Sequence, residues 1–215
     1  KTVFGKYGTV CNEPQSAASW NYNNDVNKYE FNTKRANELL DEAGWKKGTD
    51  GIRNKNGKKF QCHYLARTNN PVNEILIPIM QQNYKKLGIG VIVDSMEFET
   101  TQNKIKSGDY DMSFMGGSLG ANPDQSTVFK TNGAQNDSGY SNKKLDEEMN
   151  NALQEQRFDV RKKDYQNVWK IINDDLPQMF IYQRSDMWAI SSRVSGIDIT
   201  PYKDFTASLW KAKLK

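Results

Sequence analysis

The sequence predicts an α/β fold in which a central, mostly parallel sheet is flanked by helices. Between residues 60 and 115, short apolar runs alternate with longer segments of helical periodicity, in the order strand, helix, strand, helix, strand. This order predicts parallel strands joined by right-handed crossovers. Five Trp, ten Tyr and nine Phe residues supply core material for a chain of 215 residues, although its mean hydropathy of −0.84 indicates a very polar surface.

The charge pattern argues against a nucleic-acid-binding protein. Thirty Lys and Arg residues against 26 Asp and Glu residues give a net charge of +4. The basic residues are scattered and form no dense stripe with interleaved aromatic residues, so we expect no nucleic acid as a partner. We interpret the lysine pairs as solvated surface. These pairs are Lys46-Lys47, Lys58-Lys59, Lys85-Lys86 and Lys143-Lys144.

Neither a membrane span nor a signal peptide is predicted in these residues. No apolar run approaches the roughly 20 residues that a membrane-spanning helix needs. Because the sequence begins with Lys1 rather than Met, we expect a processed or excised chain, with any signal peptide upstream of Lys1.

The few cysteine and histidine residues predict neither a metal site nor a cofactor. Cys11 and Cys62 are the only cysteines, so they can form one bridge or remain two free thiols, and we favour free thiols. His63 is the only histidine, and one histidine cannot build a multi-histidine metal site. Adjacent side chains in a strand point to opposite faces, so Cys62 and His63 do not form a catalytic dyad. We expect a structural role for His63.

The N-terminal third begins irregularly and then forms a helix. Residues 1–31 contain Gly, Asn and interspersed aromatic residues, which predicts a segment that wraps the core and is held by aromatic side chains. Apolar residues at helical spacing predict a helix over residues 33–43, capped by Asn32 or Thr33 and ended by Gly44. The polar residues 46–59 vaguely resemble a calcium loop but lack its closing Glu, so a β-turn or a β-hairpin is the better interpretation.

Three strands and two helices follow. The pattern predicts a strand over residues 60–66, a helix over 73–87, a strand over 89–93 and a helix over 98–107. Pro78 predicts either a kink in the first of these helices or a later start. Residues 112–115 form a short apolar run that predicts the third strand, and a Gly-rich loop with an Asn-Pro-Asp turn follows it.

This loop is the candidate binding site. In open α/β sheets, ligands bind beyond the carboxyl ends of the strands. Glycine residues at such a place let a ligand approach the bare main chain, whose N–H and C=O groups can bond it. The alternative is a surface turn that binds nothing.

The C-terminal half predicts two helices, two strands and an extended tail. The helices are expected over residues 142–154 and 159–173, the second with Asp159 as its cap. The sequence Asp174-Asp175-Leu176-Pro177 should end it. Residues 179–183 and 187–190 have the composition of strands, and residues 191–215 form an extended tail. No internal repeat is present.

Several short motifs occur together in an order that resembles one known family. They are Asn32–Trp45, Asp50–Arg53 with Asn56–Lys58, Lys86–Val91, Gly108–Met112, Gly117–Asp124, Gly139–Asn142 and Val194–Gly196. From about Trp20 to the C-terminus, the chain resembles the C-terminal lobe of the family 5 extracellular solute-binding proteins. These are the peptide- and dipeptide-binding components of ABC importers.

The resemblance implies a lobe of the type II periplasmic-binding-protein-like fold, in which two lobes close on a ligand. Family members are much longer than this chain, so the N-terminal lobe is missing here. The resemblance implies that residues 1–183 form the C-terminal ligand-binding lobe and that residues 184–215 form a tail returning toward the N-terminal lobe. It also implies a peptide ligand, that lobe and a membrane ABC permease as partners, and a location in the periplasm or lipid-anchored on the cell surface.

The resemblance also implies the ligand-binding residues. The loop from Gly116 to Ser118 bonds the peptide main chain in relatives, an aromatic residue at the position of Phe98 walls the pocket, and Tyr182 lies near the cleft. The complete set of expected binding residues is Phe98, Gly116, Gly117, Ser118, Leu119, Asp124 and Tyr182.

The chain departs from some oligopeptide-binding members at two positions. Those members hold the peptide amino terminus with an Asp where Gly120 stands, and they carry an Arg where Phe114 stands. Asp124 can supply the missing carboxylate, or it can belong to a generic turn. Peptide remains the expected ligand, with its termini recognised differently or not at all.

Three alternatives remain. The ligand can be another solute that the family carries, such as a nickel complex, haem or an oligosaccharide. A hydrolase could use the paired carboxylates Asp109 and Asp111, or Asp174 and Asp175. The motifs of serine hydrolases, phosphate-binding loops and dinucleotide sites are absent from the sequence, so we predict no enzyme and no catalytic residue. The third alternative is a structural or adhesive module.

Overall fold

The computed structural model describes residues 3–117, 120–200 and 204–215, and the chain divides into two compact units. The first unit contains Val3, Lys28–Gly116 and Asp137–Gly139. The second contains Phe4–Asn27, Gly117–Asn136 and Tyr140–Lys215. None of the helices in the described ranges is long and apolar enough to cross a membrane.

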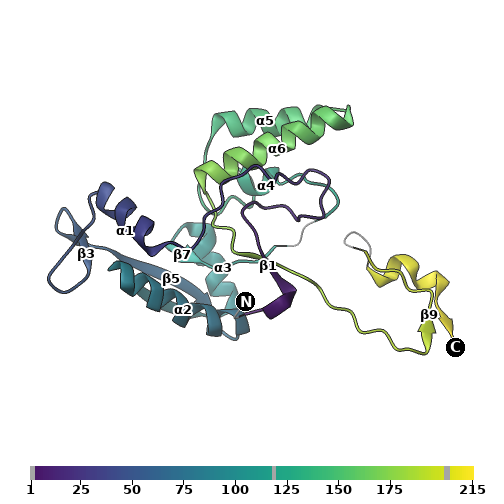
Figure 1. Cartoon of the computed structure of the whole chain (residues 1–215), viewed down its shortest axis with the longest axis horizontal. Coiled ribbons are helices and arrows are strands. Elements are labelled where there is room, and N and C mark those ends of the chain that lie inside the picture. The colour runs from purple at the N-terminus through teal and green to yellow at the C-terminus, as the bar shows by residue number, and fades with distance from the viewer. Residues whose placement is uncertain (1–2, 118–119, 201–203) are drawn as a thin grey trace. The chain divides into compact units, whose positions relative to one another are not determined.

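The first unit is built around a parallel sheet with strand order β6-β5-β7 (Figure 1). Its elements are α1 (Thr33–Glu42), β2 (Lys46–Lys47), β3 (Arg53–Lys55), β4 (Lys58–Lys59), β5 (Gln61–Arg67), α2 (Pro71–Leu87), β6 (Gly90–Met96), α3 (Phe98–Ser107) and β7 (Met112–Ser113). The central strand β5 is buried at its apolar centre, Tyr64 to Ala66. The predicted parallel pairing is confirmed, although β7 is shorter than the strand predicted over residues 112–115.

Local signals in the sequence set the ends of these helices. The Asn32 side chain accepts a hydrogen bond from the Arg35 N–H at 2.9 Å and so caps α1. Gly88 ends α2 with a φ of +81°, a conformation that glycine adopts without strain. The expected later start of α2 is wrong, because Asn70 caps the helix and Pro71 occupies its first turn. The helix continues through Pro78.

The small antiparallel sheet β2-β3-β4 confirms the predicted hairpin. Its turn places Asn56 at a φ of +52° and Gly57 at +77°, as expected for a hairpin turn with two left-handed residues. Arg53 of β3 is buried and bonds to α1 and α2. Its side chain donates to Asp41 Oδ1 at 2.8 Å, Asn37 Oδ1 at 2.7 Å and the Leu87 carbonyl at 2.8 Å.

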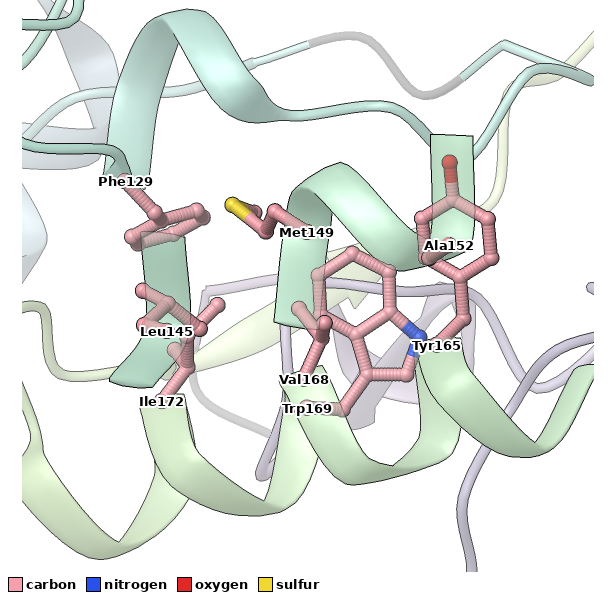
Figure 2. Close-up of a cluster of buried hydrophobic side chains, with 8 residues drawn as sticks. All are labelled: Phe129, Leu145, Met149, Ala152, Tyr165, Val168, Trp169 and Ile172. Carbon is pink, nitrogen blue, oxygen red and sulfur yellow. The ribbon is translucent and has the colours of Figure 1, made fainter. Parts of the chain in front are cut away.

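The second unit has its core between α5 and α6, which pack side by side (Figure 1). Its elements are η1 (Gly5–Tyr7), β1 (Gly8–Val10), α4 (Ser126–Phe129), α5 (Lys143–Gln154), α6 (Phe158–Asp175), β8 (Tyr182–Arg184), β9 (Val194–Ser195), η2 (Phe205–Lys211) and β10 (Lys213–Leu214). Figure 2 shows the core side chains converging from α4, α5 and α6. The core residues are Phe129, Leu145, Met149, Ala152, Tyr165, Val168, Trp169 and Ile172.

The predicted capping role of Asp159 is wrong. The helix α6 begins at Phe158, with Arg157 at the N-cap position and no side-chain capping bond. Asp159 lies in the first turn, where its charge is favourable to the positive end of the helix dipole.

The N-terminal segment packs on α6, as the sequence predicts. Asn23 donates to the Gln166 carbonyl at 2.8 Å, and the Gln166 side chain donates back to the Tyr22 carbonyl at 3.0 Å. Trp20 contacts the rings of Phe158 and Tyr165, with centroid distances of 5.0 and 5.9 Å. Aromatic contacts of Trp20 and hydrogen bonds from side-chain amide groups therefore hold this segment.

The segment after α6 differs from its prediction. Only β8 forms where two strands were expected, because β1 pairs with β8 and residues 187–190 pair with no strand in the described part of the chain. The predicted extended tail is also wrong, since β9, η2 and β10 form there. Cys11 and Cys62 are free thiols.

Candidate functional site

The carboxyl edge of the parallel sheet is the candidate site in the first unit. The strands β5, β6 and β7 end at Arg67, Met96 and Ser113. Because the strands are parallel, with Arg67 in register with Met96, these ends meet at one edge of the sheet. Ligands bind at such edges in open α/β folds.

Hydrogen bonds fix the backbone beneath this edge. The Thr68 N–H donates to the Met96 carbonyl at 2.9 Å, and its hydroxyl donates to Glu97 Oε1 at 2.9 Å. Buried Asn73 accepts from the Tyr64 hydroxyl at 2.9 Å and donates to the Arg67 carbonyl at 3.3 Å. Burial raises the pKa of Tyr64 to about 12, so its hydroxyl remains a donor at neutral pH.

Phe98 lies at this edge, in the first turn of α3, and its side chain is 51% exposed. The guanidinium carbon of Arg67 lies 4.8 Å from the centre of the Phe98 ring. This cation–π contact holds a planar, charged group beside an aromatic face. Sequence reasoning did not single out Arg67. Its position as the last residue before the turn after the central strand is the signal that could have found it.

The glycine loop after β7 exposes main chain. A Cβ atom added at Gly116 or Gly117 would meet no other atom within 4 Å. Neither residue has a left-handed φ, so the backbone conformation itself does not require glycine. The open space leaves the peptide groups accessible to another molecule. The predicted site residues Ser118 and Leu119 lie outside the described residues.

Asp124 and Tyr182 belong to the second unit, as does Gly117. Asp124 Oδ1 accepts hydrogen bonds from the N–H and hydroxyl of Ser126, at 2.9 and 2.6 Å, at the start of α4. Tyr182 is half-buried in β8, with its ring centre 4.6 Å from that of Phe4. Burial raises the pKa of Tyr182, and the nearby charge of Arg184 opposes the rise. Of the predicted site residues that the structure describes, Phe98 and Gly116 therefore belong to the first unit, and Gly117, Asp124 and Tyr182 belong to the second.

The carboxylates considered for catalysis make structural bonds. Asp109 forms an ion pair with Lys104, and Asp111 accepts a hydrogen bond from the His63 N–H at 2.6 Å. Asp174 accepts from the Asn27 side chain at 2.6 Å. Asp175 accepts from Asn142 at 2.6 Å. His63 itself contacts Asp94, with Nδ1 and Oδ2 separated by 2.8 Å.

Residues 1–140 match the family model described as bacterial extracellular solute-binding proteins, family 5 Middle. The chain belongs to this family. The match covers both the glycine loop and the carboxyl edge of the parallel sheet. The resemblance inferred from the motifs is therefore confirmed, and the family consists of substrate-binding proteins.

Two relatives, one of them also compared through its solved structure, show the range of this similarity. The oligopeptide-binding protein AppA of Bacillus subtilis is 32% identical over 216 residues, which cover 96% of this chain and 40% of AppA. The structure of AppA in complex with a nonapeptide has a TM-score of 0.85 at 30% identity, over 99% of this chain and 44% of that one. The heme-binding protein A of Haemophilus influenzae is 22% identical over 208 residues, covering 94% of this chain and 37% of that protein.

These comparisons confirm the predicted fold class, a lobe of the type II periplasmic-binding-protein fold. The chain spans about 40% of the length of the curated relatives named here. What the relatives bind is a property of those whole proteins.

Proposed function

We propose that this chain is the non-catalytic, ligand-binding lobe of an ABC-importer solute-binding protein, and that the protein captures peptides. The observation that carries the proposal is the exposed main chain at Gly116 and Gly117, in the loop that follows β7. An extended peptide can bond such a main chain as an added strand, which gives affinity with little dependence on its side chains.

The chemistry at the edge suits a peptide. Exposed Phe98 offers an apolar wall, and Arg67 beside it offers N–H donors for a carbonyl or carboxylate of the ligand. Tyr182 and Asp124, with Ser118 and Leu119 of the loop, complete the proposed set of binding residues. Asp124 keeps one carboxylate oxygen for Ser126, which leaves the other for a peptide amine.

The proposed mechanism is closure of two lobes around the ligand. Closure excludes water from the ligand and completes its hydrogen bonds. We assign residues 1–183 to the C-terminal lobe and residues 184–215 to a tail that packs on the N-terminal lobe of the full-length protein. The exposure of Trp210 and Leu214, 79% and 84%, supports this assignment, because both apolar side chains are free to pack against another surface. The closed form would then deliver its ligand to a membrane permease.

An exported protein is implied by this function. We place it in the periplasm or lipid-anchored on the outer surface of the cell, where an importer takes up its substrate. The family description as extracellular supports this placement.

Titration calorimetry of the full-length protein with pools of peptides tests the proposal. Gly117→Trp should fill the space that the ligand needs and weaken peptide binding by about tenfold or more, with little change in melting temperature. Asn151→Trp on the exposed face of α5 is the matched control and should bind as the unmodified protein does. If Gly117→Trp lowers the melting temperature and leaves the affinity unchanged, the loop is structural and the proposal fails.

A second candidate ligand is another small solute, and the similarity to a heme-binding protein favours it. Mass spectrometry of molecules that co-purify with the full-length protein separates the candidates. A mixture of short peptides supports the proposal, whereas a single haem, nickel complex or oligosaccharide supports the second candidate. Turnover of any substrate would show an enzyme.

A further inference from the structure

Lysine residues from three separate stretches of the sequence gather at the amino edge of the parallel sheet. The lysine patch consists of Lys47 of β2, Lys55 of β3, Lys58 of β4, and Lys85 and Lys86 in the last turn of α2. All five residues are exposed. Five lysines that are scattered in the sequence therefore lie in one part of the first unit.

Hydrogen bonds of the fold hold these elements together. Lys47 Nζ donates to the Lys86 carbonyl at 3.3 Å, which places β2 against the end of α2. The Arg53 N–H donates to the Gly88 carbonyl at 2.7 Å and so fixes β3 to the same place. Figure 1 shows the β3 hairpin next to one end of α2. The strand β5 begins at Gln61, directly after this hairpin, and ends at Arg67. The patch thus lies at the end of the sheet opposite the candidate ligand-binding edge.

The register of the small sheet turns three of these lysines to one side. Lys47 is opposite Arg53, and Lys55 is opposite Lys58. Because side chains alternate along a strand, Lys47, Lys55 and Lys58 project to the same side of the sheet as Arg53. That is the side on which Arg53 reaches the end of α2.

In the part of the chain that the structure describes, the five lysines are not held in direct ion pairs, although the charge of Lys47 adds to the effect of the Arg53 hydrogen bond in lowering the pKa of Asp41. Within the described ranges, none of them forms an ion pair, whereas Lys46 and Lys59 pair with Asp41 and Asp50. The helix dipole favours Lys85 and Lys86 at the end of α2 but does not reach the strand lysines. An alternative role for the strand lysines is to hinder pairing of these edge strands with other chains. That role does not explain why Lys85 and Lys86 of α2 lie beside them.

The composition of the patch selects among anionic partners. Nucleic-acid surfaces add aromatic rings that stack on bases, but the nearby rings of Trp45 and Phe60 are half-buried and stack on each other at 4.3 Å. Protein interfaces have an apolar centre and are depleted in lysine. Clustered lysines without an apolar centre instead suit a surface of anionic lipid headgroups.

We propose that the lysine patch is an electrostatic docking surface for a bilayer that contains anionic phospholipids. Bound in this way, the chain holds the amino edge of its sheet against the headgroups and turns the carboxyl edge, with Arg67 and Phe98, away from them. The proposal depends on the charges alone and stands whatever ligand the opposite edge binds.

Co-sedimentation with vesicles tests this docking surface on the 215-residue chain, with folding checked by circular dichroism. The unmodified chain should bind phosphatidylglycerol-rich vesicles at low salt, should not bind pure phosphatidylcholine vesicles, and should be released by high salt. The triple variant K47Q/K55Q/K58Q should lose affinity for the anionic vesicles by about tenfold or more. The variant K85Q/K86Q removes the two lysines that α2 contributes to the patch. It should show a smaller loss of affinity for the anionic vesicles.

The control is K144Q/K163Q/K170Q, which removes the same charge from exposed positions on α5 and α6. It should bind nearly as well as the unmodified chain. Equal losses in the two triple variants would show a net-charge effect and overturn the proposal, as would an unmodified chain that does not sediment with anionic vesicles. Binding to soluble polyphosphate without binding to vesicles would overturn it in favour of a soluble polyanion.

Discussion

Glu13 is a buried carboxyl group in the segment that packs on α6. Its side chain has no exposed surface, and its two oxygens accept from the Asn23 N–H at 3.1 and 3.3 Å. Burial raises the pKa of Glu13 to about 8, and the Asn23 hydrogen bond opposes that rise. The neighbouring ionisable groups are Cys11 and Tyr22, whose pKa values are also raised by burial. The folded chain therefore favours protonated Glu13 at neutral pH.

Glu13 should make the free energy of unfolding depend on pH. Its pKa is about 8 in the folded chain and near 4.5 when unfolded, so its stabilising contribution is complete below about pH 4.5 and is lost as the pH rises to about 8. Urea denaturation at pH 5, 7 and 8.5 measures this decline. Glu13→Gln should flatten the decline, and Glu30→Gln, at an exposed position, should not. If the free energy of unfolding declines equally with pH in the unmodified chain and in both variants, Glu13 is not the group responsible.

Arg53 should be the largest single polar contributor to the stability of the first unit. Its buried guanidinium donates hydrogen bonds to Asn37 and Asp41 of α1 and to the Leu87 carbonyl of α2. Arg53→Met should lower the free energy of unfolding by about 1–3 kcal/mol, because the Asn37, Asp41 and Leu87 oxygens lose a charged donor. Arg35→Met, which breaks only surface pairs with Glu38 and Glu42, should cost much less. Comparable shifts of the denaturation midpoint would refute this ranking.

At the scale of elements, the pairing of α5 with α6 depends on a cap as well as on the apolar core. Asn142 accepts from the N–H groups of Lys144 and Leu145 at 2.9 and 3.2 Å, which caps α5. Its amide group also donates to Asp175 in the last turn of α6, at 2.6 Å. The Asn142 side chain thus caps the start of α5 and links it by a hydrogen bond to the end of α6.

Removing this cap should destabilise the second unit. Asn142→Ala should lower the free energy of unfolding by about 1–2 kcal/mol, because two N–H groups lose their acceptor. Asn142→Ser keeps a capping oxygen and loses the bond to Asp175, so it should recover most of the loss. Thermal unfolding followed by circular dichroism measures both variants. Equal destabilisation by Ala and Ser would show that the bond to Asp175, not the cap, matters.

At the scale of the whole molecule, the proposed lobe closure predicts weak binding by this chain alone. A single lobe covers one side of a ligand and leaves the other side in water. Calorimetry should therefore find peptide affinity at least tenfold weaker for the 215-residue chain than for the full-length protein. A dissociation constant below about 1 μM for the chain alone would contradict closure as the source of affinity.

Much of the first unit could be predicted because its signals are local. The helix α3 forms over Phe98–Ser107, as predicted, and glycine at position 88 ends α2 with a left-handed φ. Expected elements without a pairing partner did not form, as residues 187–190 show. Asp159 as a cap also failed, since the helix start depends on the turn that precedes it.

The candidate site could be predicted only in part. The glycine loop was found because its composition and its place after a strand are visible in the sequence. The contact of Arg67 with Phe98 was not found, because these residues are 31 positions apart in the sequence and meet only through the β5-β6 register.

The sequence by itself determined the parallel order of the strands, most helix ends and the family, because periodicity, caps and short motifs are local properties of the chain. Only the tertiary structure decided which distant groups share an environment. The burial of Glu13, the contacts of Arg53, and the opposed positions of the ligand edge and the lysine patch all arise from packing between distant segments. Charge and burial act through space, so their effects follow the distances in the fold rather than the order of the residues.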